Sequence, residues 1–328
     1  MNTVAWYVSL IAVYVIFGTF GIFLKLLKTD YIYFTYIIFI CVGATSMIVD
    51  YIETNKHNKK VNSSKLIENT ELSEYVNKKK PFYTKVYSKK EYILISVANY
   101  VRLLLLTTAL SFKDLGAIVA TYLTFPIFVA VFGIKMINYI PNKLDIAGIV
   151  ITFIGILIIN FNSIRRLLNS DFNKMSLYSF LYPLIGAMCI SYLILISKKK
   201  DDLTTNEVIQ VQFLPVIPIA TFITLTRHLS PFIKIYDFFK IPYVKPNITK
   251  LFETFLYCII VFYLSYFILY GFTKKYSPLL ASIISYISVF VSFLVKKYYF
   301  KREIKHYKYW ASLLIIAGII LISYSHHK

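Results

Sequence analysis

The chain has 328 residues, is 58% hydrophobic and carries a formal net charge of +20. This composition, with a mean hydropathy of +0.63, excludes an ordinary soluble domain, in which roughly 45–50% of residues are apolar. Apolar runs of about 20 residues recur along the chain, as in proteins that cross a membrane several times. The charge does not indicate nucleic-acid binding, because the lysines lie mostly between these runs, where they can contact lipid headgroups. We therefore expect an all-α polytopic membrane protein whose partner is the lipid bilayer.

Several sequence features argue against chemistry that needs a cofactor or a metal. Cys41, Cys189 and Cys258 lie inside apolar runs without CxxC spacing, so we interpret them as buried apolar side chains and expect no metal or other cofactor. The pattern GxxxxGK[ST] does not occur in the sequence, so ATP hydrolysis at a P-loop is not expected. The N-terminal run lacks a basic leading segment and a small-residue cleavage site, which predicts a retained first helix.

Ten apolar runs predict ten transmembrane helices. They cover residues 5–27, 31–50, 92–112, 115–136, 144–161, 175–197, 206–227, 251–272, 276–298 and 307–325. Two stretches between these runs differ in composition. The polar stretch 52–90 is rich in Lys, Asn, Ser and Glu and predicts a disordered insert. The stretch 231–250 mixes aromatic side chains with lysines and predicts a segment in the membrane interface.

The third, fourth and fifth runs are repeated in the eighth, ninth and tenth. Similar strings begin at Glu91 and Glu253, at Ala120 and Ala281, and at Phe153 and Ile316, which are offsets of 162, 161 and 163 positions. A nearly constant offset over three helices predicts a duplicated five-helix unit. The first unit covers residues 1–161 and includes the polar insert 52–90, residues 162–174 form a linker, and the second unit covers residues 175–328.

The odd number of helices in each unit has a topological consequence. A unit that crosses the membrane five times delivers the second unit from the opposite side, so the two units are inverted repeats. Many secondary transporters use this arrangement for alternating access to a site at the middle of the membrane. The basic residues of the loops divide almost evenly between the two sides, so the positive-inside rule does not set the orientation.

Two stretches of the first unit carry a resemblance to a known family. "ALSFKDLGAIVATYLTFPIFVAVFG" (109–133) and "LDIAGIVITFIGILIINF" (144–161) combine a short turn, a small-residue helix, a mid-helix proline and a final helix with two glycines. The second unit repeats this order without the proline, and "FKRE" places Glu303 between its last two helices. These motifs resemble the EamA-like form of the drug/metabolite transporter superfamily. The resemblance implies ten helices, cytosolic termini, and transport of nucleotide sugars, phosphorylated sugars, amino acids, purines or drugs.

Arg102 is a permanent cation in the middle of the third apolar run. Eleven positions separate it from Glu91 and from Lys113, which is roughly 16 Å along a helix in either direction. Asn99 and two alanines share its face of the helix, so we expect the guanidinium to point into the protein. Burial of arginine at this depth costs from about 2.5–3.5 kcal/mol on insertion scales to about 10 kcal/mol or more in simulations, so it needs a partner.

Three explanations of Arg102 are open at this point. In the first, the partner of the guanidinium is a substrate anion. In the second, the partner is an internal carboxylate or a set of backbone carbonyl groups. In the third, this run is wrongly assigned as a membrane span. Leu264 occupies the equivalent position of the second unit, and a cation needed only for folding would be expected in both copies. This favours a ligand, because a guanidinium matches a carboxylate or phosphate group through a bidentate fork.

The other candidate substrate-binding residues lie on the helices expected to face a central cavity. They are Asn99 beside Arg102, Thr121 and Thr124 on the fourth run, and Ser285 and Tyr286 on the ninth. Ser285 belongs to a serine stripe (282, 285, 288 and 292), and small hydroxyl residues serve helix packing equally well. Gln210 and Gln212 on the seventh run are weaker candidates. Pro126 is expected to kink its helix and to free a carbonyl.

The favoured function is secondary transport of a small anionic or phosphorylated metabolite, such as a sugar phosphate or nucleotide sugar. No carboxylate is expected at the midplane to carry a proton, which favours exchange (an antiporter) or facilitated diffusion. The alternatives are a transporter of neutral, amino-acid-like or drug-like solutes, a channel, and a membrane-embedded enzyme acting on lipid. Only the basic run 296–308 resembles an interfacial enzyme site, so we expect no enzyme. These features are compatible with a homodimer. They are also compatible with a location in the plasma membrane or in an organelle membrane.

Overall fold

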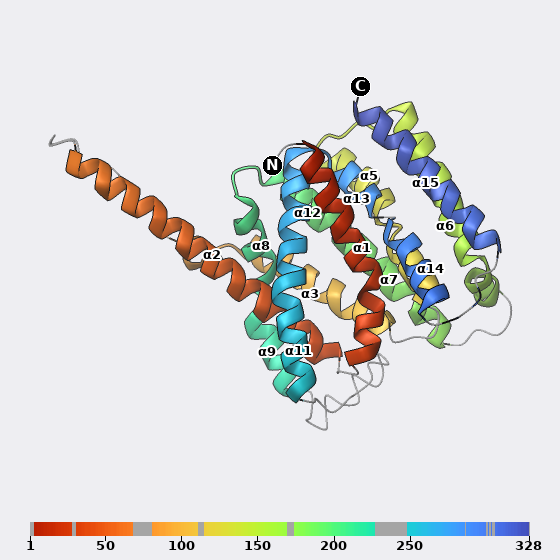
Figure 1. The fold of residues 1–328 in the computed structure, drawn as a ribbon, viewed down its shortest axis with the longest axis horizontal. Coiled ribbons are helices and arrows are strands. Elements are labelled where there is room, and N and C mark those ends of the chain that lie inside the picture. Colours follow the sequence, from red (N-terminus) through yellow and green to blue (C-terminus); the bar gives the residue numbers. More distant parts are fainter. Residues whose placement is uncertain are drawn as a thin grey trace.

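The computed structural model describes residues 3–27, 31–67, 81–110, 115–168, 174–226, 248–285, 287–299, 301, 303 and 306–327, and these contain helices and no strand (Figure 1). The helices are α1 (Thr3–Leu27), α2 (Tyr31–Ile67), η2 (Phe82–Thr84), α3 (Lys90–Leu110), α4 (Leu115–Tyr122), α5 (Phe125–Met136), α6 (Lys143–Leu168), α7 (Lys174–Lys199), α8 (Thr205–Phe213), α9 (Ile217–Thr226), α11 (Ile248–Tyr257), the π-helix η3 (Cys258–Tyr263), α12 (Leu264–Lys275), α13 (Pro278–Ile284), α14 (Ile287–Tyr298) and α15 (His306–His327). The all-α class is therefore confirmed.

Five helical segments of the described part are long and apolar enough to cross a membrane. They are Ile32–Lys59, Lys90–Leu110, Leu177–Lys199, Thr205–Thr226 and Phe252–Lys275. Each of the ten predicted runs overlaps one helix or a series of consecutive helices. The long apolar helices are consistent with a multi-pass integral membrane protein, because a helix needs about 20 apolar residues to cross the hydrocarbon core.

The prediction of a disordered insert at 52–90 was wrong over its first part. α2 continues to Ile67 as one helix and protrudes from the bundle (Figure 1). The polar stretch has no glycine or proline before Pro81, and its lysines and glutamates have good helix propensity, so nothing ends the helix at the edge of the apolar run. Residues 68–80, and residues 231–247 of the predicted interfacial segment, lie outside the described residues.

Three of the predicted runs are interrupted rather than continuous helices. The first break lies at residues 123–124 between α4 and α5, because the ring of Pro126 would clash with the carbonyl group of Tyr122 in an unbroken helix. The second lies at residues 214–216 between α8 and α9, where Pro215 and Pro218 remove two backbone N–H donors. The third follows Ile284 at the end of α13 and has no proline.

Serine side chains accompany the break after α13. The hydroxyl groups of Ser282 and Ser288 donate to the carbonyl groups of Leu279 and Ser285, both at 2.6 Å, and Ser285 donates in the same way to Ser282. Such local side-chain bonds compete with the helical pattern and bend helices. The break in the second unit therefore has a different chemical origin from the proline break in the first.

α6 and α15 pack closely together along one side of the bundle (Figure 1). Gly148 of α6 faces Gly318 and Ile322 of α15, whereas Gly155, two turns further along α6, faces Ala311 and Ile315. The residue numbers of the two helices change in opposite directions along the contact, so the helices are antiparallel. Glycines at the contact allow the two backbones to approach closely, as in other membrane helix pairs.

α2 packs against α8 and α9, also in the antiparallel direction. The backbone carbonyl of Ser46 accepts hydrogen bonds from Asn206 at 2.9 Å and from Gln210 at 3.2 Å, both on α8. Nearer the start of α2, Tyr36 accepts a hydrogen bond from Thr221 of α9 at 3.2 Å. Two further sets of contacts correspond to each other: α7 packs against α3 and α5, and α1 packs against α12 and α14.

We expect Gly318→Ala to destabilise the protein by about 1–3 kcal/mol, the usual cost of overpacking. A Cβ atom at Gly318 would lie 2.2 Å from Oγ1 of Thr152 and 2.6 Å from the backbone oxygen of Gly148, so α6 and α15 would have to separate. Gly133→Ala is the matched control, because its nearest neighbour, Cβ of Tyr139, would lie at an ordinary 3.4 Å. Melting temperatures of the two purified variants test this, and equal values would contradict the close contact.

Candidate functional site

Arg102 lies inside the bundle on α3, and only 3% of its surface is exposed. Its Nε and Nη2 atoms donate to Oδ1 of Asn99 at 3.0 and 2.8 Å. Nη1 donates to the hydroxyl oxygen of Tyr122 on α4 at 2.9 Å, and Nη2 donates to that of Tyr266 on α12 at 2.6 Å. The guanidinium carbon also lies 5.7 Å from the centre of the Tyr266 ring. Neutral side chains from three helices therefore hold the cation.

None of these partners of Arg102 carries a negative charge. Within the described part of the chain, the one ion pair joins Lys200 and Glu91 at 2.9 Å, near the ends of α7 and α3. The two buried aspartates are bonded elsewhere, since Asp50 accepts from the backbone N–H of Phe82 at 2.7 Å and Asp145 accepts from that of Asn142 at 3.1 Å. Arg102 is thus a buried cation without an internal counter-ion among the described residues.

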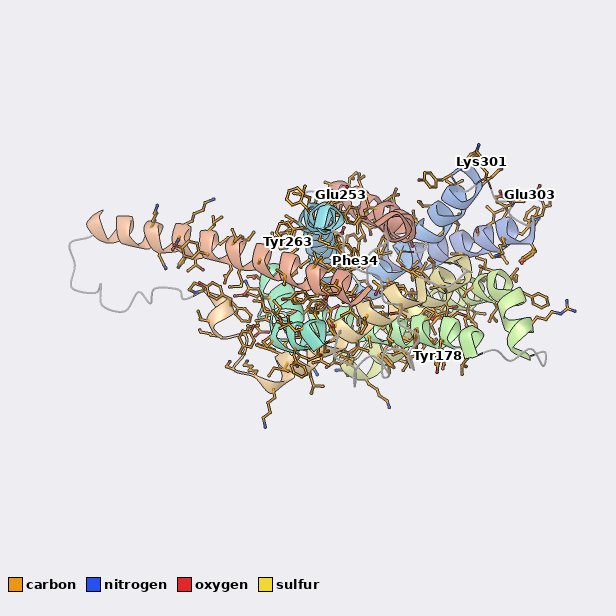
Figure 2. All side chains as sticks on the ribbon, turned by 90° about the horizontal axis from the view of Figure 1, so that it is seen from below. Phe34, Tyr178, Glu253, Tyr263, Lys301 and Glu303 are labelled. Atoms are coloured by element: carbon orange, nitrogen blue, oxygen red, sulfur yellow. The ribbon has the colours of Figure 1, made fainter. Side chains whose placement is uncertain are left out.

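Three further carboxylates lie near the ends of helices or between them. Glu207 caps α8, where its side chain accepts from the backbone N–H of Thr204 at 2.7 Å. Glu253 is exposed on α11, and Glu303 is exposed in the connection between α14 and α15, at the edge of the molecule (Figure 2). At Lys200, which follows α7, the hydrogen bond from its ammonium group to Glu91 raises the pKa of the lysine.

The break between α8 and α9 supplies the second set of polar groups around Arg102. Val216 donates its backbone N–H to Oγ of Ser96 at 3.1 Å, not to the carbonyl group of Gln212 four residues earlier. That carbonyl group accepts instead from Ser96 at 3.0 Å and from Nδ2 of Asn99 at 3.2 Å. Asn99 therefore joins the freed backbone of α8 to the guanidinium, which fixes the orientation of its amide group.

Tyrosines complete this cluster on the side of α12. The rings of Tyr266 and Tyr270 stack with their centres 5.8 Å apart, and Phe213 packs against Tyr266 at 5.0 Å. The hydroxyl group of Tyr270 donates to Oε1 of Gln212. Nε2 of Gln212 has no hydrogen-bond partner, although this side chain is fully buried. We call Asn99, Arg102, Tyr122, Gln212, Tyr266 and Tyr270 the arginine cluster.

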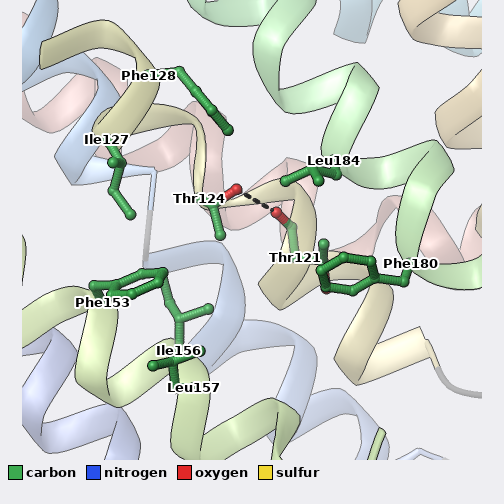
Figure 3. Close-up of a pocket in the computed structure, with 9 residues that line it drawn as sticks. All are labelled: Thr121, Thr124, Ile127, Phe128, Phe153, Ile156, Leu157, Phe180 and Leu184. Carbon is green, nitrogen blue, oxygen red and sulfur yellow. Dashed lines mark hydrogen bonds between the residues drawn. The ribbon is translucent and has the colours of Figure 1, made fainter. Parts of the chain in front are cut away.

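Thr121 and Thr124 line a separate pocket next to the break between α4 and α5 (Figure 3). The pocket has a volume of about 330 Å³. Its other lining residues are Ile127, Phe128, Phe153, Ile156, Leu157, Phe180 and Leu184. The hydroxyl group of Thr124 donates to the carbonyl oxygen of Thr121 at 2.8 Å, so the pocket is essentially apolar. None of these lining residues belongs to the arginine cluster, although Thr121 precedes Tyr122 on α4.

The structure thus brings together two of the predicted site residues, Arg102 and Asn99, and one of the weaker candidates, Gln212. Thr121 and Thr124 lie together in the pocket, and Ser285 donates its hydroxyl group within its own helix. Tyr286 lies outside the described residues. Sequence reasoning missed the three tyrosines of the cluster. The chain has 29 tyrosines, and only the four-residue spacing of Tyr266 and Tyr270, which places both on one helix face, could have indicated them.

Ser285→Ala is expected to leave stability and any transport activity within about twofold of the wild type, because the role of this serine is local helix geometry. Its hydroxyl group donates to the carbonyl group of Ser282, which keeps the backbone hydrogen bond from Ser285 at 3.2 Å. Uptake into proteoliposomes and the melting temperature measure both quantities. A loss of uptake at unchanged melting temperature would instead place Ser285 in the substrate site.

Comparison with known proteins supports the fold. No protein-family model matches the chain, and no curated protein matches it. By contrast, 16 chains of solved structures match. One of them, described as "Crystal structure of protein", has a TM-score of 0.64 and 12% sequence identity over 99% of this chain and 98% of that chain. At this identity the likeness shows that the two chains share a fold over nearly their whole length.

Proposed function

We propose that this chain is a secondary transporter of the drug/metabolite transporter kind, which carries a small anionic metabolite by alternating access between two inverted five-helix halves. One observation carries the proposal. Arg102 is buried among neutral side chains and has no carboxylate partner in the described part of the chain. A desolvated cation is costly unless it is paired, and a transported anion would pair with it.

The packing of equivalent helices supports the inverted halves. α6 and α15 are the fifth helices of the two predicted units, and α2 corresponds to α8 with α9. Both pairs are antiparallel, as a two-fold axis in the membrane plane requires. The contacts of α7 in the second half with α3 and α5 in the first also match those of α1 in the first half with α12 and α14 in the second.

The helix breaks support the same repeat. The break after α4 begins at Leu123 and the break after α13 begins at Ser285, which are 162 positions apart, the offset found in the sequence. Interrupted helices at corresponding positions of the two halves are typical of transporter sites at the middle of the membrane. The arginine cluster lies beside the first break, through Tyr122 at the end of α4.

Uptake into proteoliposomes tests the proposed function. The purified full-length chain is reconstituted and offered radiolabelled sugar phosphates, nucleotide sugars, carboxylates and neutral amino acids. We expect saturable uptake of at least one anion, which increases when the same unlabelled anion is loaded inside, because exchange returns a loaded carrier faster than an empty one. Protein-free liposomes are the control. Uptake of neutral solutes only, or non-saturable flux, would contradict an anion carrier.

A further inference from the structure

We propose that the arginine cluster selects monoanions over dianions, so that the substrate carries a single negative charge, such as one carboxylate, rather than a phosphate ester. This inference rests on the proposed function and narrows its substrate class. It follows from the charge of the enclosed site, the rings that surround it and the hydrogen-bond donors that remain unused.

The first argument is the number of charges. Among the side chains whose burial the structure describes, Arg102 is the only buried basic one. Its hydrogen-bonding partners Asn99, Tyr122 and Tyr266 are neutral, so the cluster has a charge of +1. A bound monoanion brings the enclosed charge to zero. A dianion leaves one negative charge in a site shielded from water, where an uncompensated charge is strongly disfavoured.

The second argument is the kind of surface around the guanidinium. The rings of Tyr266 and Tyr270 stack beside it, and the ring of Phe213 packs against Tyr266 at a tilt of 59°. The faces of aromatic rings carry partial negative charge, which attracts a cation and repels an anion. Excess negative charge on a ligand would therefore meet no compensating group on this side of the site.

The third argument is the set of unused donors. A guanidinium has five N–H donors, and the four hydrogen bonds of Arg102 leave one N–H on Nη1, next to Tyr122. Nε2 of Gln212 is a further buried donor without a partner. A carboxylate can accept hydrogen bonds from donors of this kind, but they provide no second positive charge for the additional charge of a phosphate ester.

Matched pairs of ligands test this selectivity on the purified full-length protein. Succinamate and succinate differ mainly in one charge, and glycerate and glycerol phosphate at pH 8 compare a carboxylate monoanion with a phosphate-ester dianion. We expect the monoanion of at least one pair to raise the melting temperature and to inhibit uptake with an inhibition constant about tenfold lower than that of its dianion. Arg102→Met should remove this effect, and Arg165→Met, at an exposed arginine of α6, should retain it.

The outcomes separate the two proposals. Equal or stronger inhibition by the dianions, with uptake still dependent on Arg102, would overturn monoanion selectivity and leave the anion carrier intact. No stabilisation by either member of any pair, together with no anion uptake, would overturn both. Monoanion inhibition that persists in Arg102→Met would place the selective site elsewhere and overturn the assignment to the arginine cluster.

Discussion

Replacing Arg102 with methionine is expected to lower anion uptake by about 100-fold or more, because truncation of one partner of a desolvated charge pair costs several kcal/mol. The melting temperature should nevertheless change by less than about 5 °C. The substitution removes four hydrogen bonds, but it also removes the desolvation penalty of a buried cation without a counter-ion. Each of these opposing terms amounts to several kcal/mol, so they largely cancel.

The matched control is Arg165→Met. Arg165 is exposed near the end of α6, so the same change of side chain should leave uptake and stability close to the wild-type values. The two variants are compared for uptake in proteoliposomes and for thermal unfolding in detergent. An Arg102→Met protein that unfolds at a much lower temperature would show that the cation is needed for folding, and wild-type uptake would remove it from the substrate site.

Asn99→Asp is expected to abolish anion uptake in a protein that still folds. Oδ1 of Asn99 already lies 2.8 and 3.0 Å from two guanidinium nitrogens, so an aspartate of the same shape would supply an internal counter-ion. The cluster would then be neutral, and a substrate anion would no longer compensate a charge. The lost hydrogen bond from Nδ2 to the carbonyl group of Gln212 costs about 1–3 kcal/mol, which the new ion pair offsets.

The control is the same substitution at Asn55 of α2, Asn55→Asp, because the side chain of Asn55 is only half-buried. It adds one negative charge to the polar continuation of α2, and we expect normal uptake. Uptake and the melting temperature are measured for both variants. If Asn99→Asp carried the anion at the wild-type rate, the positive charge of the arginine cluster would not be what attracts the substrate.

The apolar runs predicted where the helices lie because helix length and hydropathy are local properties of the chain. They did not predict where α2 ends. The change from apolar to polar residues at residue 52 means that the helix leaves an apolar environment, but the polar residues still favour a helical backbone. The proline at 126 indicated an irregular helix, and the break occurs a few residues earlier. The break after Ile284 has no such signal, because it arises from serine hydroxyl groups that could equally serve packing.

The candidate site was predictable only in part for a similar reason. Arg102 and Asn99 share one helix face, and their spacing of three residues is visible in the sequence. Tyr122 and Tyr266 reach the guanidinium from α4 and α12, and Gln212 of α8 contacts Asn99 and Tyr270. Such contacts depend on the packing of helices far apart in the chain. Tyrosine is common throughout this sequence, so no local pattern distinguishes the residues of the cluster from those that face lipid.

Equilibrium binding of the radiolabelled anion with the highest uptake is the most direct test of the central claim. It is measured on purified wild-type protein and on the Arg102→Met and Arg165→Met variants. The account predicts saturable binding of one anion per chain to the wild type and to Arg165→Met, and no binding to Arg102→Met. Equal binding to all three proteins would contradict it.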